Sequence, residues 1–317
     1  MDFFTGILET VGPILILLGA GIFIRKKEIL SPPQIEGLKT LVVKFALPAA
    51  LFLTFLKMEL KISLIAFPVF IFLLCLLTYA YGHLRTRRNG GLNPAFPYLM
   101  SSFEFGMLGL ILFAAAFGRE NLGKLAIAGL GQEFFVWFVM IPHVSGMAGN
   151  KHSRILILKS FVTNPALMGI FAGLALNLLG FARWGADLAL SGMISSTLDT
   201  LSALIVPSVL IFIGYGMVIN RTYIREAAGL ILQRLAVMAV PVGLFILLGI
   251  SRILNLDIYY SLGILTLFLL PPPFVIPLFL NEERKALLPR INGILVLYTV
   301  FTIIAFCVLA AAAAPFL

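Results

Sequence analysis

The chain has 317 residues, of which 61% are hydrophobic and only 12% are charged, and its mean hydropathy is +1.07. A soluble domain carries about 25% charged residues, so this composition excludes a mainly soluble protein and indicates a polytopic membrane protein. The net charge of +9 does not indicate nucleic-acid binding, because the basic residues fall in short loops between apolar segments.

Ten apolar segments are long enough to cross a bilayer, which takes about 20 helical residues. In chain order, spans 1 to 10 are 7–24, 35–56, 62–82, 94–118, 124–147, 155–180, 195–219, 227–250, 259–280 and 291–314. The longest stretch between spans is 181–194, and the other connections are short. The sequence therefore predicts an all-α membrane protein with ten transmembrane helices.

The basic residues predict how these spans are oriented. The loops after spans 1, 3, 5, 7 and 9 hold fourteen of them: Arg25, Lys26, Lys27, Arg85, Arg87, Arg88, Lys151, Arg154, Lys159, Arg221, Arg225, Arg284, Lys285 and Arg290. The opposite side holds six: Lys57, Lys61, Arg119, Lys124, Arg183 and Arg252. Because cytoplasmic loops are enriched in Lys and Arg, we expect both termini to lie outside the cell (inner) membrane.

Weak internal similarity divides the chain into two halves. Span 2 carries LPAALFLTF from Leu47, and span 7 carries VPSVLIFIG from Val206. Span 1 opens with GPILILLGAG from Gly12, and span 6 with NPALMGIFAG from Asn164. The halves are 1–152 and 153–317, and five spans per half require the second to be inverted. An inverted 5+5 repeat is typical of secondary transporters.

The fourth span of each half is interrupted near its centre. Span 4 carries Ser101, Ser102, Glu104, Gly106 and Gly109, and span 9 carries Pro271, Pro272, Pro273, Phe274 and Pro277. Interrupted backbone is tolerated at this depth only where protein or a water-filled cavity satisfies the freed polar groups. We therefore predict that the two interruptions cross and form a substrate site, where a half-helix N-terminus attracts anions.

Glu104 is the most informative polar residue within a span. It lies about ten residues into span 4, which is about 15 Å deep. A carboxyl group there faces a cavity or a partner, so it is a candidate site for substrate, proton or sodium, or else a structural carboxylate. Lys44, at a similar depth in span 2, is expected to pair with Glu104, to attract a substrate anion or to extend toward the membrane surface.

Four other polar residues are weaker candidates. Glu133 in span 5 and Arg234 in span 8 favour a structural ion pair over a substrate site. Asp199 favours an end-of-helix group over an ion ligand. Asn164, before Pro165, favours the first turn of span 6 over a site residue.

No enzyme motif is present: the chain has no Gly-rich phosphate loop, no HExxH and no nucleophile elbow. We expect no enzymatic activity and no cofactor or metal other than a coupling proton or sodium ion. Cys75 and Cys307 lie in apolar segments and are expected to be inert packing residues.

Spans in inverted fives with interruptions in spans 4 and 9 resemble the auxin efflux carrier family, which includes plant auxin carriers and bacterial malonate and organic-acid permeases. Its span 4 pattern, Asn-x-Gly-x-x-Gly-x-Pro, reads Glu104, Gly106, Gly109 and Ile111 here. Its Pro-x-x-x-x-Pro in span 9 matches Pro272 and Pro277. Sodium–bile-acid symporters share the crossed architecture more distantly, and they use acidic groups for sodium.

The resemblance implies an elevator mechanism in a homodimer, with spans 1, 2, 6 and 7 as scaffold and spans 3–5 and 8–10 as transport domain. We expect a secondary transporter of a small organic anion, coupled to protons or sodium through Glu104. The alternatives are a non-transporting membrane sensor or lipid-binding protein on the same fold, and a passive channel.

Overall fold

The computed structural model describes residues 3–58, 61–88, 94–144, 159, 162–181, 189–216, 221–279 and 286–316. Throughout these ranges the regular structure is helical, without any strand. Six helices there are long and apolar enough to cross a membrane: Pro32–Lys57, Ile62–Arg88, Arg119–Val144, Gly192–Gly216, Arg221–Leu254 and Leu288–Phe316. This agrees with the prediction of an all-α membrane protein.

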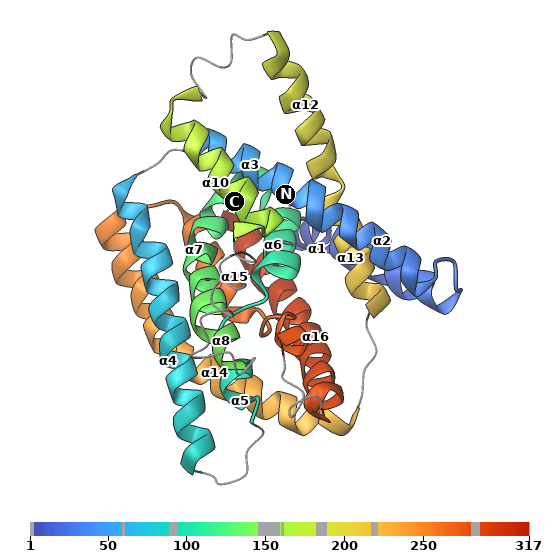
Figure 1. The fold of residues 1–317 in the computed structure, drawn as a ribbon, viewed down its shortest axis with the longest axis vertical. Helices are drawn as coiled ribbons and strands as arrows, with labels where there is room; N and C mark the ends of the chain where they lie inside the picture. The colour runs from blue at the N-terminus through green and yellow to red at the C-terminus, as the bar shows by residue number, and fades with distance from the viewer. Residues whose placement is uncertain are drawn as a thin grey trace.

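Figure 1 shows the arrangement of the helices. Their bounds are α1 (Phe3–Lys26), α2 (Pro32–Leu41), α3 (Leu47–Lys57), α4 (Ala66–Arg88), α5 (Phe96–Met100), α6 (Leu110–Phe117), α7 (Leu122–Phe135), α8 (Ile141–Val144), α10 (Pro165–Leu178), α12 (Ala189–Ala203), α13 (Ile205–Gly216), α14 (Ile224–Leu244), α15 (Ile258–Leu269) and α16 (Leu288–Ala313). A π-helical turn at Val42–Ala46 joins α2 to α3, and another at Val136–Met140 joins α7 to α8. A longer π-helical segment, Phe245–Leu254, continues α14.

Capping residues set the start of two of these helices. The Asn164 side chain accepts hydrogen bonds from the amides of Ala166 and Leu167 at 3.0 and 3.4 Å, and Pro165 occupies the first helical position of α10. Asp257 caps α15 in the same way through the Tyr259 amide at 3.0 Å. A side-chain acceptor satisfies amides that have no partner within the helix. The expectation that Asn164 marks the first turn of span 6 is confirmed.

Small residues bring two pairs of helices into backbone contact. α1 packs against α13, and α3 packs against α10. A Cβ added at Gly214 would overlap the Leu18 carbonyl, and one added at Gly169 would overlap the Pro48 carbonyl. Glycine at these positions therefore allows the close approach that van der Waals packing between membrane helices favours.

The core of the molecule lies around α15. This helix contacts α6, α7, α14 and α16, and Figure 1 shows it among them near the centre. α4 packs against α7, α14 packs against α16, and both α8 and α16 contact the 3₁₀ turn Ile276–Phe279 that follows α15 in the chain.

Candidate functional site: a crossover of two interrupted spans

Both predicted interruptions are present in the structure. α5 ends at Met100, Ser101–Glu104 is not helical, and the chain resumes as a π-helical turn at Phe105–Gly109 before α6. In span 9, α15 ends at Leu269 and a short 3₁₀ turn follows at Ile276–Phe279. Of the residues predicted to interrupt span 4, Ser101, Ser102 and Glu104 lie in the non-helical segment, whereas Gly106 and Gly109 belong to the π-helical turn.

Direct hydrogen bonds join the two interrupted segments. The Glu104 amide donates to the Pro271 carbonyl oxygen at 2.7 Å, and the Phe274 amide donates to Glu104 Oε2 at 2.6 Å. Thr302 of α16 donates its hydroxyl to the Leu269 carbonyl at 2.7 Å, where α15 ends. The prediction that the interruptions meet is confirmed. Each segment satisfies polar backbone groups that the other leaves open, as membrane burial requires.

Glu104 lies at the centre of this crossover. Only 7% of the residue is exposed, and Pro271, Pro272 and Pro273 beside it are buried. Its carboxylate accepts the hydrogen bond of the Phe274 amide, which lies at the start of the segment that follows the prolines. The sequence predicted an anion site at that position, and here a carboxylate of the protein itself fills it.

The two serines of span 4 are buried against Met140 of the π-helical turn before α8. Ser102 Oγ lies 3.4 Å from Met140 Sδ, and Ser101 Oγ donates to the Tyr98 carbonyl at 3.2 Å. Ser102 has a φ of +52°, a left-handed backbone conformation that is uncommon for a residue with a side chain. The hydroxyls hold the segment in place on its α8 side.

The two glycines of span 4 have different surroundings. A Cβ at Gly109 would lie 2.6 Å from Leu270 Cδ1, so Gly109 permits the close approach of the second interruption. A Cβ at Gly106 would have no heavy atom within 4 Å. Gly106 therefore borders open space at the crossover.

Two long polar side chains reach the Ser101–Glu104 segment from neighbouring spans. Gln132 of α7 accepts a hydrogen bond from the Phe103 amide at 2.5 Å, and Arg234 of α14 donates Nη2 to the Ser102 carbonyl. The predicted ion pair between Glu133 and Arg234 is not formed. Glu133 instead accepts hydrogen bonds from Trp137 Nε1 at 3.0 Å and from Gln132 Nε2 at 3.4 Å. The ion pair was predicted from the depth of the two residues along their spans, and depth does not reveal which neighbour the face of α14 with Arg234 contacts.

Lys44 and Asp199 lie away from these contacts. Lys44 is exposed on the π-helical turn between α2 and α3, and neither a hydrogen bond nor an ion pair joins it to Glu104. Asp199 is exposed on α12, where its carbonyl accepts a hydrogen bond from Arg119 Nη1 at 3.3 Å. The crossover thus brings together the residues predicted in spans 4 and 9, together with Arg234.

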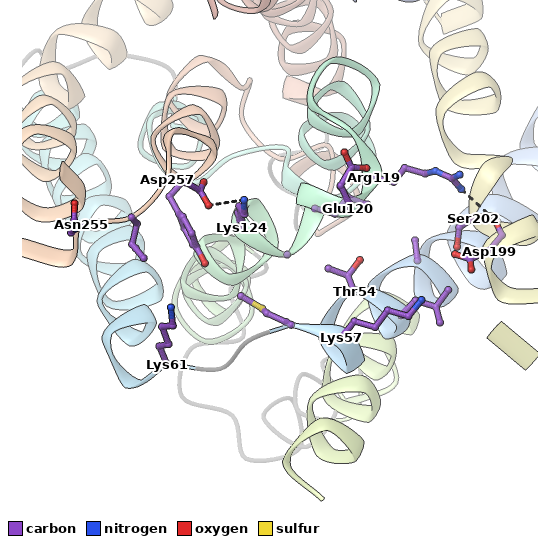
Figure 2. A pocket seen from close by; sticks show the side chains of 17 residues that line it. Thr54, Lys57, Lys61, Arg119, Glu120, Lys124, Asp199, Ser202, Asn255 and Asp257 are labelled. Carbon is purple, nitrogen blue, oxygen red and sulfur yellow. Dashed lines mark hydrogen bonds and ion pairs between the residues drawn. The ribbon is translucent and has the colours of Figure 1, made fainter. Parts of the chain in front are cut away.

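A cavity of about 670 Å³ is lined by several charged side chains (Figure 2). It lies between α3 and α12 on one side and α7 and the start of α15 on the other. Its charged lining residues are Lys57, Lys61, Arg119, Glu120, Lys124, Asp199 and Asp257. Lys124 and Asp257 form an ion pair at 2.7 Å. The four basic residues belong to the six that sequence analysis assigned to the outer side.

A second cavity, of about 440 Å³, is lined mainly by helical residues. It lies between α2 and α13 on one side and α16 and the second interruption on the other, and its polar residues include Glu36, Lys39, Tyr215 and Asn292. Phe274 and Pro277 also line it. Because the Phe274 amide binds Glu104, this cavity extends to the crossover.

Sequence reasoning did not identify Gln132, Met140 and Thr302 as parts of the crossover. All three are neutral residues in long apolar helices, where a single polar or sulfur-containing side chain is a weak signal. Their positions depend on which helix faces meet. Gln132 alone, next to Glu133 in the middle of a span, carries a polarity that could have indicated it.

Comparisons with known proteins agree with a transport role. The chain is 26% identical over 231 residues to an uncharacterized transporter of Methanothermobacter thermautotrophicus, an alignment covering 71% of this chain and 72% of that protein. It is 27% identical over 222 residues to an uncharacterized transporter of Methanocaldococcus jannaschii, covering 66% and 68%. No family model matches the chain. These names, with the apolar helical structure, support a transporter.

Proposed function

We propose that this protein is a secondary active transporter of a small organic anion, with its substrate site at the crossover of spans 4 and 9. The observation that carries the proposal is the contact between two interrupted segments, 170 residues apart in the chain, at the buried carboxylate of Glu104. Paired interrupted helices at mid-membrane are the arrangement in which secondary transporters bind substrates and coupling ions.

The packing of the helices supports an inverted repeat of 1–152 and 153–317. α1 packs on α13 and α3 packs on α10, which pairs span 1 with span 7 and span 2 with span 6. Exchanging the two halves converts one pair into the other. α4 with α7 and α14 with α16 are related in the same way. In this proposal spans 1, 2, 6 and 7 are the scaffold, and spans 3–5 and 8–10 carry the crossover.

The positions of the two cavities support elevator-type alternating access. Each lies between helices of the proposed scaffold and helices of the proposed transport domain, at opposite ends of that boundary. The cavity that reaches Phe274 would give access from the cytoplasm. We also propose that transport is coupled to protons or sodium through Glu104. The protein is further proposed to form a homodimer in the cell membrane and to belong to the auxin efflux carrier family. Lys44 and Asp199 are kept as secondary candidates for ion attraction.

Flux into proteoliposomes tests this function. Radiolabelled organic anions, including acetate, malonate and citrate, are offered with an inward proton gradient, with a sodium gradient and with neither. A secondary transporter accumulates its substrate above equilibrium only with a gradient. Equilibration without accumulation identifies a passive channel, and binding without flux identifies a sensor. Either outcome would replace the proposal.

A further inference from the structure

Arg234 brings a positive charge to the crossover from α14. Its exposed fraction is 0%. Nη2 donates to the Ser102 carbonyl, and the guanidinium lies 5.0 Å from the centroid of the Phe103 ring and 5.5 Å from that of Tyr298. Arg234 therefore contacts the interrupted segment of span 4 on one side, while Pro271 and Phe274 contact it on another.

Arg234 forms no ion pair with a carboxylate in the described part of the chain. The ion pairs found there join Lys39 to Glu36, Lys124 to Asp257 and Arg290 to Glu226. Nε and Nη1 of Arg234 have no hydrogen-bond partner among the described residues, and neither does the hydroxyl of Tyr298. Arginine stays protonated in proteins, and an unpaired charge buried in a membrane protein is strongly unfavourable. Such a group persists where it has a functional partner.

We propose that Arg234 binds the carboxylate group of the transported anion, with the Tyr298 hydroxyl as a second donor. This inference rests on the proposed function and names the residue that selects for negative charge. Nε and Nη1 offer the donors that a carboxylate accepts, and charge-assisted hydrogen bonds are about twice as strong as neutral ones. The rings of Phe103 and Tyr298 exclude water and strengthen this attraction.

Access to Arg234 involves the Ser101–Glu104 segment. The Ser102 carbonyl and the Phe103 ring cover the guanidinium, so an anion reaches it only when this segment moves. The same movement changes the hydrogen bond between Glu104 and Phe274. Binding of the anion at Arg234 is thereby linked to the carboxylate that we propose as the coupling group.

Thermal unfolding of the purified full-length protein tests the inference directly, with sodium acetate, malonate and citrate as probes and sodium chloride at equal ionic strength as reference. A ligand that binds only the folded state raises the unfolding temperature. We expect one of the three carboxylates to stabilise the wild type, and Arg234→Met to weaken its binding by more than about tenfold. The matched control is Arg252→Met, which removes an exposed arginine from the same continuous helix and should bind like the wild type.

Further variants keep the test decisive if Arg234→Met does not fold. Arg234→Lys keeps the charge but loses the planar donor geometry, and it should fold and bind the carboxylate more weakly. Unchanged affinity in Arg234→Lys or Arg234→Met would overturn the proposal, as would equal stabilisation by chloride or no stabilisation of the wild type by any probe. Recovery of wild-type binding in Arg234→Met combined with Glu104→Gln would also overturn it, by showing that Arg234 only balances Glu104.

The flux assay separates this inference from the function on which it rests. Gradient-driven uptake that is unchanged in Arg234→Met would leave the transporter in place and remove Arg234 from its site. Carboxylate stabilisation that depends on Arg234, without flux of any anion, would leave the binding site in place and remove the transport function.

Discussion

At the scale of single residues, Glu104 has two roles that can be separated. Its carboxylate accepts the Phe274 amide and so holds the two interruptions together, and its buried position makes it the candidate coupling group. A side-chain amide oxygen can accept the same hydrogen bond without the charge, whereas alanine cannot. Comparing these two substitutions therefore distinguishes the structural role from the transport role.

We expect Glu104→Gln to fold with a stability close to that of the wild type and to lose gradient-driven accumulation, while exchange of substrate for substrate continues. Glu104→Ala should lose accumulation and also about 1–3 kcal/mol of stability, because the buried Phe274 amide loses its acceptor. Thermal unfolding and proteoliposome uptake measure the two effects. Accumulation at the wild-type rate in Glu104→Gln would exclude Glu104 as the coupling group.

At the scale of helices, backbone contact at glycines holds the pairs α1–α13 and α3–α10 together. The Cβ that Gly214 lacks would overlap the Leu18 carbonyl of α1, whereas Gly216, two residues further along α13, has no heavy atom within 4 Å of such a Cβ. A main-chain carbonyl in a helix cannot rotate away as a flexible side chain can. Replacing Gly214 by alanine therefore improves helix propensity but adds a steric clash, whereas replacing Gly216 by alanine only improves helix propensity.

We predict that Gly214→Ala destabilises the protein by about 1–3 kcal/mol, because overpacking forces α1 and α13 apart. Gly216→Ala should be neutral or stabilising by up to about 1 kcal/mol, since alanine is the better helix former. Unfolding curves of the two variants in detergent measure the difference. Equal stabilities of the two variants would show that α1 and α13 can move apart to accommodate the added methyl group without loss of stability.

At the scale of the whole molecule, the boundary between the proposed scaffold and transport domain determines how the protein moves. Thr54 of α3 and Gly123 of α7 face each other across this boundary, where a Cβ at Gly123 would lie 2.9 Å from Thr54 Cγ2. Both residues line the larger cavity. A covalent bond between them would join one proposed domain to the other and block the relative movement that an elevator mechanism requires.

We expect the double variant Thr54→Cys and Gly123→Cys, made with Cys75 and Cys307 replaced by Ala, to form a disulfide under mild oxidation. The positions are close enough for disulfide geometry. Uptake should stop on oxidation and return on reduction, while each single variant should keep its uptake under both conditions. Full uptake by the cross-linked protein would rule out relative motion of α3 and α7.

Orientation in the membrane is a second property of the whole molecule. Residues of the even-numbered loops, among them Lys57, Arg119 and Asp257, line the larger cavity, and α1 contacts the 3₁₀ turn Ala314–Phe316 that follows α16. From the fourteen-to-six count of basic residues, we predict that the loop at 83–93 is cytoplasmic. A single cysteine at position 87 should react with an impermeant thiol reagent only after the cells are opened. Labelling in intact cells would reverse the orientation.

The sequence by itself determined the class of the protein and the places where its helices are interrupted. Apolar length and low charge indicate membrane helices. Consecutive prolines interrupt a helix whatever its neighbours are, and a carboxylate within a span makes exposure of that position to lipid unfavourable. These are local properties, so Glu104, Pro271 and Asn164 could be interpreted from their positions in the chain.

Only the tertiary structure decided which side chains meet. It placed Arg234 against Ser102 and not beside Glu133, and it left Lys44 exposed and apart from Glu104. In a uniformly apolar helix the hydrophobic pattern does not identify the inward face, because lipid and protein interior accept the same side chains. The rotation of each helix is set by packing at glycines and by hydrogen bonds to interrupted backbone, and both depend on partners far away in the chain.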